Sequence, residues 1–120
     1  MSTTITDIGT VAIPVTDQDR AVTFYVDVLG FDKHLDATTD SGMRWVMVAP
    51  PGAHCSLALT AAPAGKDTGI RLTATDVDRE HRAMTERDVD VDEVLRWPGV
   101  PAMFGFRDPD GNTLYVVETP

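Results

Sequence analysis

Residues 13–30 read IPVTDQDRAVTFYVDVLG, and this stretch decides the fold. Up to Val15, larger apolar residues alternate with smaller ones, which is typical of a half-buried strand. After Arg20, apolar residues recur at helical spacing as far as Gly30. Glycine ends helices because it adopts the left-handed backbone conformation without strain. The stretch therefore predicts a strand, a short connection and a helix.

The connection between strand and helix occurs twice in the chain. Residues 16–20 read TDQDR and residues 75–79 read TDVDR, an offset of 59 residues. The second copy also follows an alternating apolar stretch and precedes a helical pattern. Such self-similarity indicates repeated structural units. We predict two similar modules, of about residues 5–62 and 67–120.

Each copy of the connection carries an aspartate at the point where the strand gives way to the helix. These residues are Asp17 and Asp76. A carboxylate at this position accepts hydrogen bonds from the free N–H groups of the first helical turn. We interpret both aspartates as helix caps.

Apolar stretches bounded by glycine, proline and aspartate predict the remaining strands. They cover residues 31–37, 44–48 and 55–60 in the first half, and 89–95, 102–106 and 113–118 in the second. Each half therefore reads β-α-β-β-β, which predicts an α+β fold.

Composition and charge exclude several classes of function. The chain has 120 residues, 42% of them hydrophobic, and a net charge of −9. An acidic surface repels phosphate backbones and attracts cations, so we expect no nucleic-acid partner. A single cysteine, Cys55, excludes a disulfide within the chain. Without a signal peptide or a membrane-spanning stretch, we expect a cytoplasmic protein with no membrane partner.

Two motifs at this spacing resemble the vicinal oxygen chelate (VOC) superfamily, the glyoxalase/bleomycin resistance/dioxygenase group. The first motif covers residues 13–31, and the second is FRDPDGN at residues 106–112, followed by a strand. The resemblance implies a single VOC domain over residues 1–120. Its two βαβββ modules would form a curved mixed sheet, a cup with the helices on its outer face. The resemblance also implies a homodimer, and in many members a divalent metal ion in the cup.

The positions at which metal-dependent relatives carry His or Glu differ in this chain. The resemblance places Thr10, Gly69 and Tyr115 at these positions, and the fourth strand of the first module reads SLALT at residues 56–60. None of these side chains is a usual ligand for a catalytic divalent metal. We therefore predict no metal ion and no cofactor.

The histidines offer no alternative metal site. His34 falls on a strand and His81 in a helix, so they should not converge. His54 precedes Cys55 at the start of a strand, where neighbouring side chains point to opposite faces. We interpret the pair as a surface histidine beside a buried structural cysteine.

Strand alternation predicts an apolar and aromatic pocket in the cup. Its candidate ligand-binding residues are Trp45, Met47, Arg71, Trp97, Met103 and Tyr115. An inward-facing arginine could grip a carboxylate or phosphate, or pair with an acidic residue across the sheet. Trp45, Met47 and Met103 fit a core or a dimer interface equally well. Arg107 is expected to pair with a neighbouring aspartate of the turn, Asp108 or Asp110.

Three functions fit these observations. The first is a metal-independent small-molecule-binding protein, similar to bleomycin resistance proteins, that sequesters a cationic or aromatic drug or natural product. The alternative is a VOC-fold enzyme, a glyoxalase-like lyase, isomerase or cyclase, with Tyr115, Arg71 and His54 as candidate catalytic residues. The third is a dimeric module whose apolar cup is largely filled by its own side chains and which serves a protein partner. The sequence leaves open whether the cup lies within one chain or across two.

Overall fold

The computed structural model describes residues 2–120, which form two compact units that meet between Ala62 and Pro63. The first unit contains β1 (Thr10–Val15), α1 (Gln18–Val22), η1 (Thr23–Val28), β2 (Asp32–Thr38), β3 (Arg44–Ala49) and β4 (Ser56–Ala61). Its sheet has the strand order β1-β4-β3-β2, with β1 and β4 parallel and the other pairs antiparallel.

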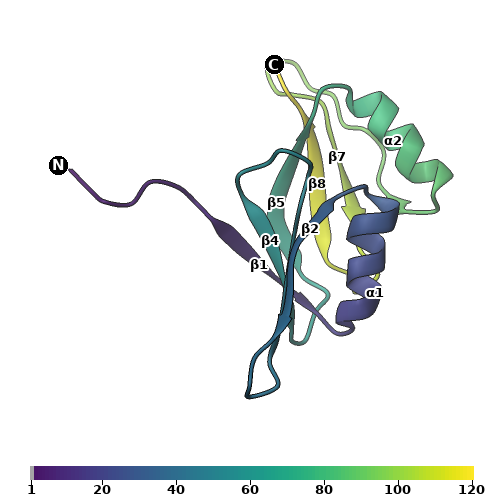
Figure 1. The fold of residues 1–120 in the computed structure, drawn as a ribbon. Coiled ribbons are helices and arrows are strands. Elements are labelled where there is room, and N and C mark those ends of the chain that lie inside the picture. Colours follow the sequence, from purple (N-terminus) through teal and green to yellow (C-terminus); the bar gives the residue numbers. More distant parts are fainter. Residues whose placement is uncertain (1) are drawn as a thin grey trace. The chain divides into compact units, whose positions relative to one another are not determined.

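The second unit repeats this arrangement. It contains β5 (Asp67–Ala74), α2 (Val77–Glu86), β6 (Asp90–Val91), β7 (Met103–Arg107) and β8 (Thr113–Glu118). The strand order is β5-β8-β7-β6, again with the outer pair β5 and β8 parallel. Figure 1 shows β5, β8 and β7 beside one another, with α2 in the same unit.

The predicted α+β fold of two βαβββ modules is confirmed. Five of the six strands predicted by residue range begin and end within one residue of the observed strands. The strand predicted over residues 89–95 was wrong in extent, since only Asp90–Val91 forms a strand, with a separate bridge between Leu95 and Met103. Aspartate has low strand propensity, and a bulge interrupts the pairing. The single-domain organisation of the two units stays a prediction.

Both helices begin at the aspartates that the repeat singled out. Oδ1 of Asp17 accepts a hydrogen bond from the backbone N–H of Arg20, and Oδ1 of Asp76 accepts one from Arg79, each at 3.0 Å. The helical segment continues as a π-helix, η1, which ends at Val28 and is followed after Leu29 by Gly30, whose φ is +83°. Among the described residues, no helix is long and apolar enough to span a bilayer.

The core of the second unit lies between its sheet and α2. Phe104 and Phe106 of β7 and Leu114 of β8 are fully buried, and α2 contributes Val77 and Met84. Because adjacent strand residues face opposite sides, this core leaves Met103, Gly105 and Tyr115 on the other face of the sheet.

A buried asparagine joins the start of the second unit to its final hairpin. Oδ1 of Asn112, which has no exposed surface, accepts hydrogen bonds from the backbone N–H groups of Gly65 and Lys66 at 3.0 and 3.1 Å. Its Nδ2 donates to Oδ2 of the buried Asp108 at 3.0 Å. The FRDPDGN motif therefore holds the segment that leads into β5.

We expect Asn112→Ala to lower the free energy of unfolding in urea by roughly 2–4 kcal/mol, because buried backbone donors lose their acceptor. Asn112→Asp keeps the acceptor but sets a carboxylate against Asp108, and an intermediate loss is expected. The control Glu86→Ala, on the exposed end of α2, should stay within about 0.5 kcal/mol. An Asn112→Ala loss no larger than the control's would contradict this role.

Candidate functional site

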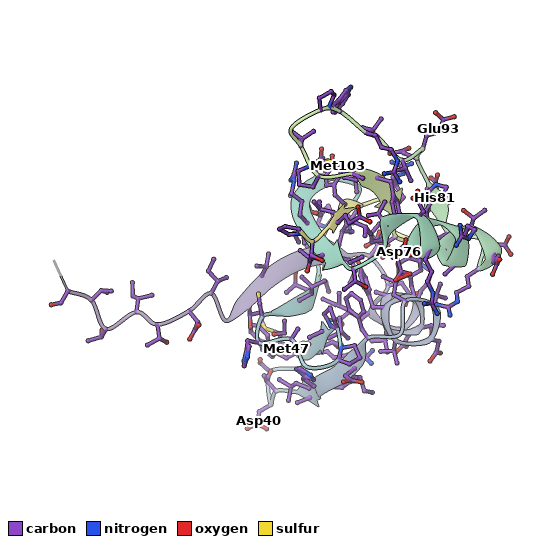
Figure 2. The ribbon with its side chains drawn as sticks, turned by 90° about the horizontal axis from the view of Figure 1, so that it is seen from above. Asp40, Met47, Asp76, His81, Glu93 and Met103 are labelled. Carbon is purple, nitrogen blue, oxygen red and sulfur yellow. The ribbon has the colours of Figure 1, made fainter. Side chains whose placement is uncertain are left out.

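A cavity of about 390 Å³ lies on the face of β7 and β8 that carries Met103, Gly105 and Tyr115. It is lined by Asp92, Glu93, Leu95, Met103, Phe104, Gly105 and Tyr115. This volume falls within the range of small-molecule sites. Such sites are also lined, as here, mostly by apolar side chains with a few polar groups. Figure 2 labels Met103 and Glu93, which belong to this cavity, and His81 on α2.

A bulge in the segment after β6 builds one wall of the cavity. The backbone N–H of Asp92 donates to the carbonyl of Gly105 at 2.8 Å, and that of Leu95 donates to the carbonyl of Met103 at 2.7 Å. Two residues of this segment therefore lie opposite one residue of β7, which defines a β-bulge. In a regular strand, Asp92 and Leu95 would face opposite sides. The extra residue places both side chains on the cavity.

The side chain of Asp92 is held in place by Arg107. Its carboxylate accepts hydrogen bonds from Nη1 and Nη2 of Arg107 at 3.0 and 2.6 Å, and Nη2 also donates to Asp90 at 3.2 Å. The Arg107 guanidinium lowers the pKa of the Asp92 carboxyl, which therefore stays ionised at neutral pH. The expected pairing of Arg107 with Asp108 or Asp110 was wrong, since the hairpin turns those residues away while β6 lies alongside β7.

The backbone of Asp92 is held from the helix side. Nε2 of His81 on α2 donates to the carbonyl oxygen of Asp92 at 2.9 Å. The imidazole also packs edge-to-face on Phe104, with ring centroids 5.0 Å apart. His81 is thus a structural anchor of the bulge.

Gly105 leaves room for the two polar groups that meet at the cavity. A Cβ atom at this position would lie 2.7 Å from Oδ2 of Asp92 and 3.4 Å from the ring of Tyr115. The φ angle of Gly105 is not positive, so backbone conformation does not require glycine here. Glycine inside a strand often marks a close approach of this kind.

Tyr115 belongs to a second polar network beside the cavity. Its hydroxyl donates to Oδ2 of Asp67 at 2.7 Å, and Oδ1 of Asp67 accepts from the backbone N–H of Gly69 at 3.0 Å. The hydrogen bond to Asp67 raises the pKa of Tyr115 and lowers that of Asp67. Arg71 lies over the Tyr115 ring at 4.8 Å and donates to the carbonyl of Gly69 at 2.7 Å. The phenol therefore stays protonated at neutral pH.

The six predicted ligand-binding residues do not share one cavity. Met103 and Tyr115 line the cavity described above, while Trp97, 60% exposed, lines another of about 380 Å³ with Arg96 and Val100. Neither Met47 nor Arg71 is among the residues that line the cavities described here.

Trp45 lines a cavity of about 440 Å³ in the first unit, together with Gln18, Met43 and Arg44. The guanidinium of Arg44 is paired with two carboxylates. It forms a two-pronged ion pair with Asp36 at 2.9 Å and another with Asp19 at 2.6 Å, and its hydrogen bonds lower the pKa of Asp36. This cavity therefore offers the exposed indole of Trp45, and its one charged side chain, Arg44, is already paired with carboxylates.

The first unit also holds His54 and Cys55, and both are exposed. The prediction of a buried structural cysteine was therefore wrong. Cys55 lies one residue before β4 begins, so the burial of that strand does not extend to its side chain.

The side chains at the metal positions implied by the resemblance do not fit a divalent ion. Oγ1 of Thr10 hydrogen-bonds to Oγ of Ser56 at 3.1 Å, Gly69 offers no side chain, and Tyr115 is bound to Asp67 beneath a guanidinium. Within residues 2–120, no three His, Cys, Asp or Glu side chains are grouped to hold a metal. The donor set is that of a hydrogen-bonded network.

The sequence reasoning missed Asp92, Leu95 and Gly105 as cavity residues. Asp92 fell within the strand predicted over residues 89–95 and was not expected at the cavity, because the bulge that turns it inward leaves no mark in an alternating pattern. Gly105 could have been noticed, since a glycine between Phe104 and Phe106 in a buried strand indicates a close neighbour.

A family model described as the Glyoxalase/Bleomycin resistance protein/Dioxygenase superfamily matches residues 7–116. The chain belongs to this superfamily. The resemblance stated from the two motifs is confirmed.

Two solved structures are similar over nearly the whole chain. TnmS3, an antibiotic binding protein from Streptomyces sp. CB03234, is 33% identical with a TM-score of 0.87, over 99% of this chain and 100% of that one. A superfamily member from Sphaerobacter thermophilus DSM 20745 is 36% identical with a TM-score of 0.91, over 96% and 98%. An uncharacterized Bacillus subtilis protein, YetH, is 40% identical over 55 residues. That match covers 46% of each chain, so this protein is matched to about half the length of YetH.

We expect Asp67→Asn to lower the pKa of Tyr115 toward the ordinary tyrosine value, because the phenol loses its anionic acceptor. The pKa can be followed by NMR of ring-labelled tyrosine, and Tyr25, fully buried, gives a separate signal. Glu86→Gln serves as a control of equal charge change. A Tyr115 pKa that is the same in Asp67→Asn and wild type would show that the hydrogen bond is not formed in solution.

Proposed function

We propose that this protein binds a small, largely apolar molecule with a planar part in the cavity of the second unit, without a metal ion. Such binding would serve the sequestration of a drug or natural product. The observation that carries the proposal is the cavity itself, in which apolar walls surround one pinned carboxylate. The similarity of the chain to TnmS3, an antibiotic binding protein, supports the same proposal.

An enzyme acting by acid–base chemistry is the weaker candidate. The proton of Tyr115 is committed to Asp67, and the raised pKa makes the phenol a poor base at neutral pH. Arg71 is engaged with the carbonyl of Gly69, and His54 lies on an exposed turn of the first unit. None of the three candidate catalytic residues is poised to move a proton within the cavity.

The homodimer and the cytoplasmic location are part of this proposal. Several large apolar side chains of the described residues are exposed, among them Ile5, Ile8, Met43 and Trp97. A second copy of the chain would cover such side chains in a homodimer.

The proposal is tested with two flat tricyclic probes of nearly equal shape, acridine and 9-aminoacridine, by fluorescence titration. We expect wild type to bind at least one of them, and Leu95→Trp, which fills the cavity, to weaken binding by about tenfold or more. Val100→Trp places the same large side chain in the separate cavity beside Trp97 and should leave the Kd within about twofold.

Binding should be unchanged by EDTA, by added Zn²⁺ and, within a few-fold, by Tyr115→Phe. Failure of wild type to bind either probe would contradict the proposal. Equal binding by Leu95→Trp and wild type would place the ligand elsewhere, and a requirement for metal would overturn the metal-independent reading.

A further inference from the structure

We propose that Asp92 is the residue that sets the specificity of the second-unit cavity, and that it selects ligands bearing a protonated amine or amidine beside a flat apolar body. This inference rests on the proposed function and adds the chemical class of the ligand. Three observations support it: the contacts that hold Asp92, the net negative charge of the carboxylates near it, and the apolar side chains that line the same cavity.

Two side chains fix Asp92 before any ligand arrives, and a third residue leaves room for it. His81 binds its backbone carbonyl at 2.9 Å, Arg107 binds its carboxylate at 2.6 and 3.0 Å, and Gly105 provides the space in which the carboxylate lies. A group held in place in this way costs little further entropy when it binds a ligand. The side chain is still 53% exposed, so a ligand can reach it.

The guanidinium does not neutralise the site. Arg107 is shared between Asp90 and Asp92, and Glu93 adds a third carboxylate at the cavity. Figure 2 shows the side chain of Glu93 directed outward, so it contributes charge at the rim. The two carboxylates that share Arg107 therefore keep a net negative charge. A carboxylate has about four acceptor sites, and the two bonds from Arg107 leave others for an N–H donor.

The remaining walls favour a flat apolar body. Leu95, Met103 and the Tyr115 ring line the cavity. Of the nearby guanidiniums, Arg107 is paired with two carboxylates, and Arg71 lies close enough to Asp67 to lower the pKa of that carboxyl. An ammonium ion could form a charge-assisted hydrogen bond with Asp92 while its apolar part covers Leu95 and Met103.

The test compares the same two probes in four proteins. 9-Aminoacridine is protonated at neutral pH, whereas acridine is neutral and has nearly the same shape. Wild type should bind the cation about tenfold more tightly, as expected for one partly exposed charge-assisted contact. Asp92→Asn should reduce this preference to about twofold, and Asp92→Glu should restore most of it. Glu86→Gln removes one distant charge and should keep the full preference.

The outcomes separate this inference from the proposed function. If both probes bind wild type equally, or if Asp92→Asn keeps the wild-type preference, the specificity role of Asp92 is overturned while small-molecule binding stands. If Asp92→Asn weakens both probes equally, Asp92 acts only on the structure of the cavity, and the inference is again overturned. If neither probe binds wild type, the proposed function fails first. Melting temperatures of all four proteins report whether each variant is folded.

Discussion

Burial of Phe104 and Phe106 under α2 is the constraint on which the second unit depends. Both rings have no exposed surface, and together with Leu114 they form the centre of the core. A strand that commits alternate residues to the core must present the intervening ones on its other face. The position of Met103, Gly105 and Tyr115 on the cavity face is therefore a consequence of how the core packs.

The polar features of the cavity follow from a local break in that regularity. The bulge after β6 lets Asp92 and Leu95 face the same side, and His81 holds the bulge by the carbonyl of Asp92. Gly105 then leaves space for the carboxylate. Arg107, two residues farther along the same face of β7, orients it through hydrogen bonds. A surface that would otherwise be a plain apolar sheet thereby acquires one oriented charge. The other polar group beside the cavity, the hydroxyl of Tyr115, donates a hydrogen bond to Asp67.

The repeat in the sequence predicted the fold well, because helix caps and strand alternation are local. Asp17 and Asp76 form the expected caps, and alternation correctly separated Met103 from Phe104. The site was predicted only in part, since its decisive contacts join segments far apart in the sequence. The partners of Arg107 lie across the sheet at positions 90 and 92, and sequence neighbours gave no sign of them. A bulge changes, by one residue, which side chains lie on each face of the sheet. This change cannot be inferred from alternation alone.

The central claim, that the ligand lies on β7 beside the bulge, is tested most directly by methyl NMR. The chain has five methionines, and Met103 lines the second-unit cavity, Met43 lines the first-unit cavity and Met84 is buried in the core of the second unit. With methyl-labelled methionine and Met103→Leu to assign the signal, 9-aminoacridine is added stepwise. Ring currents from the bound probe should shift the Met103 methyl signal, while the signals of Met43 and Met84 stay in place. A shift of Met43 with no change at Met103 would contradict it.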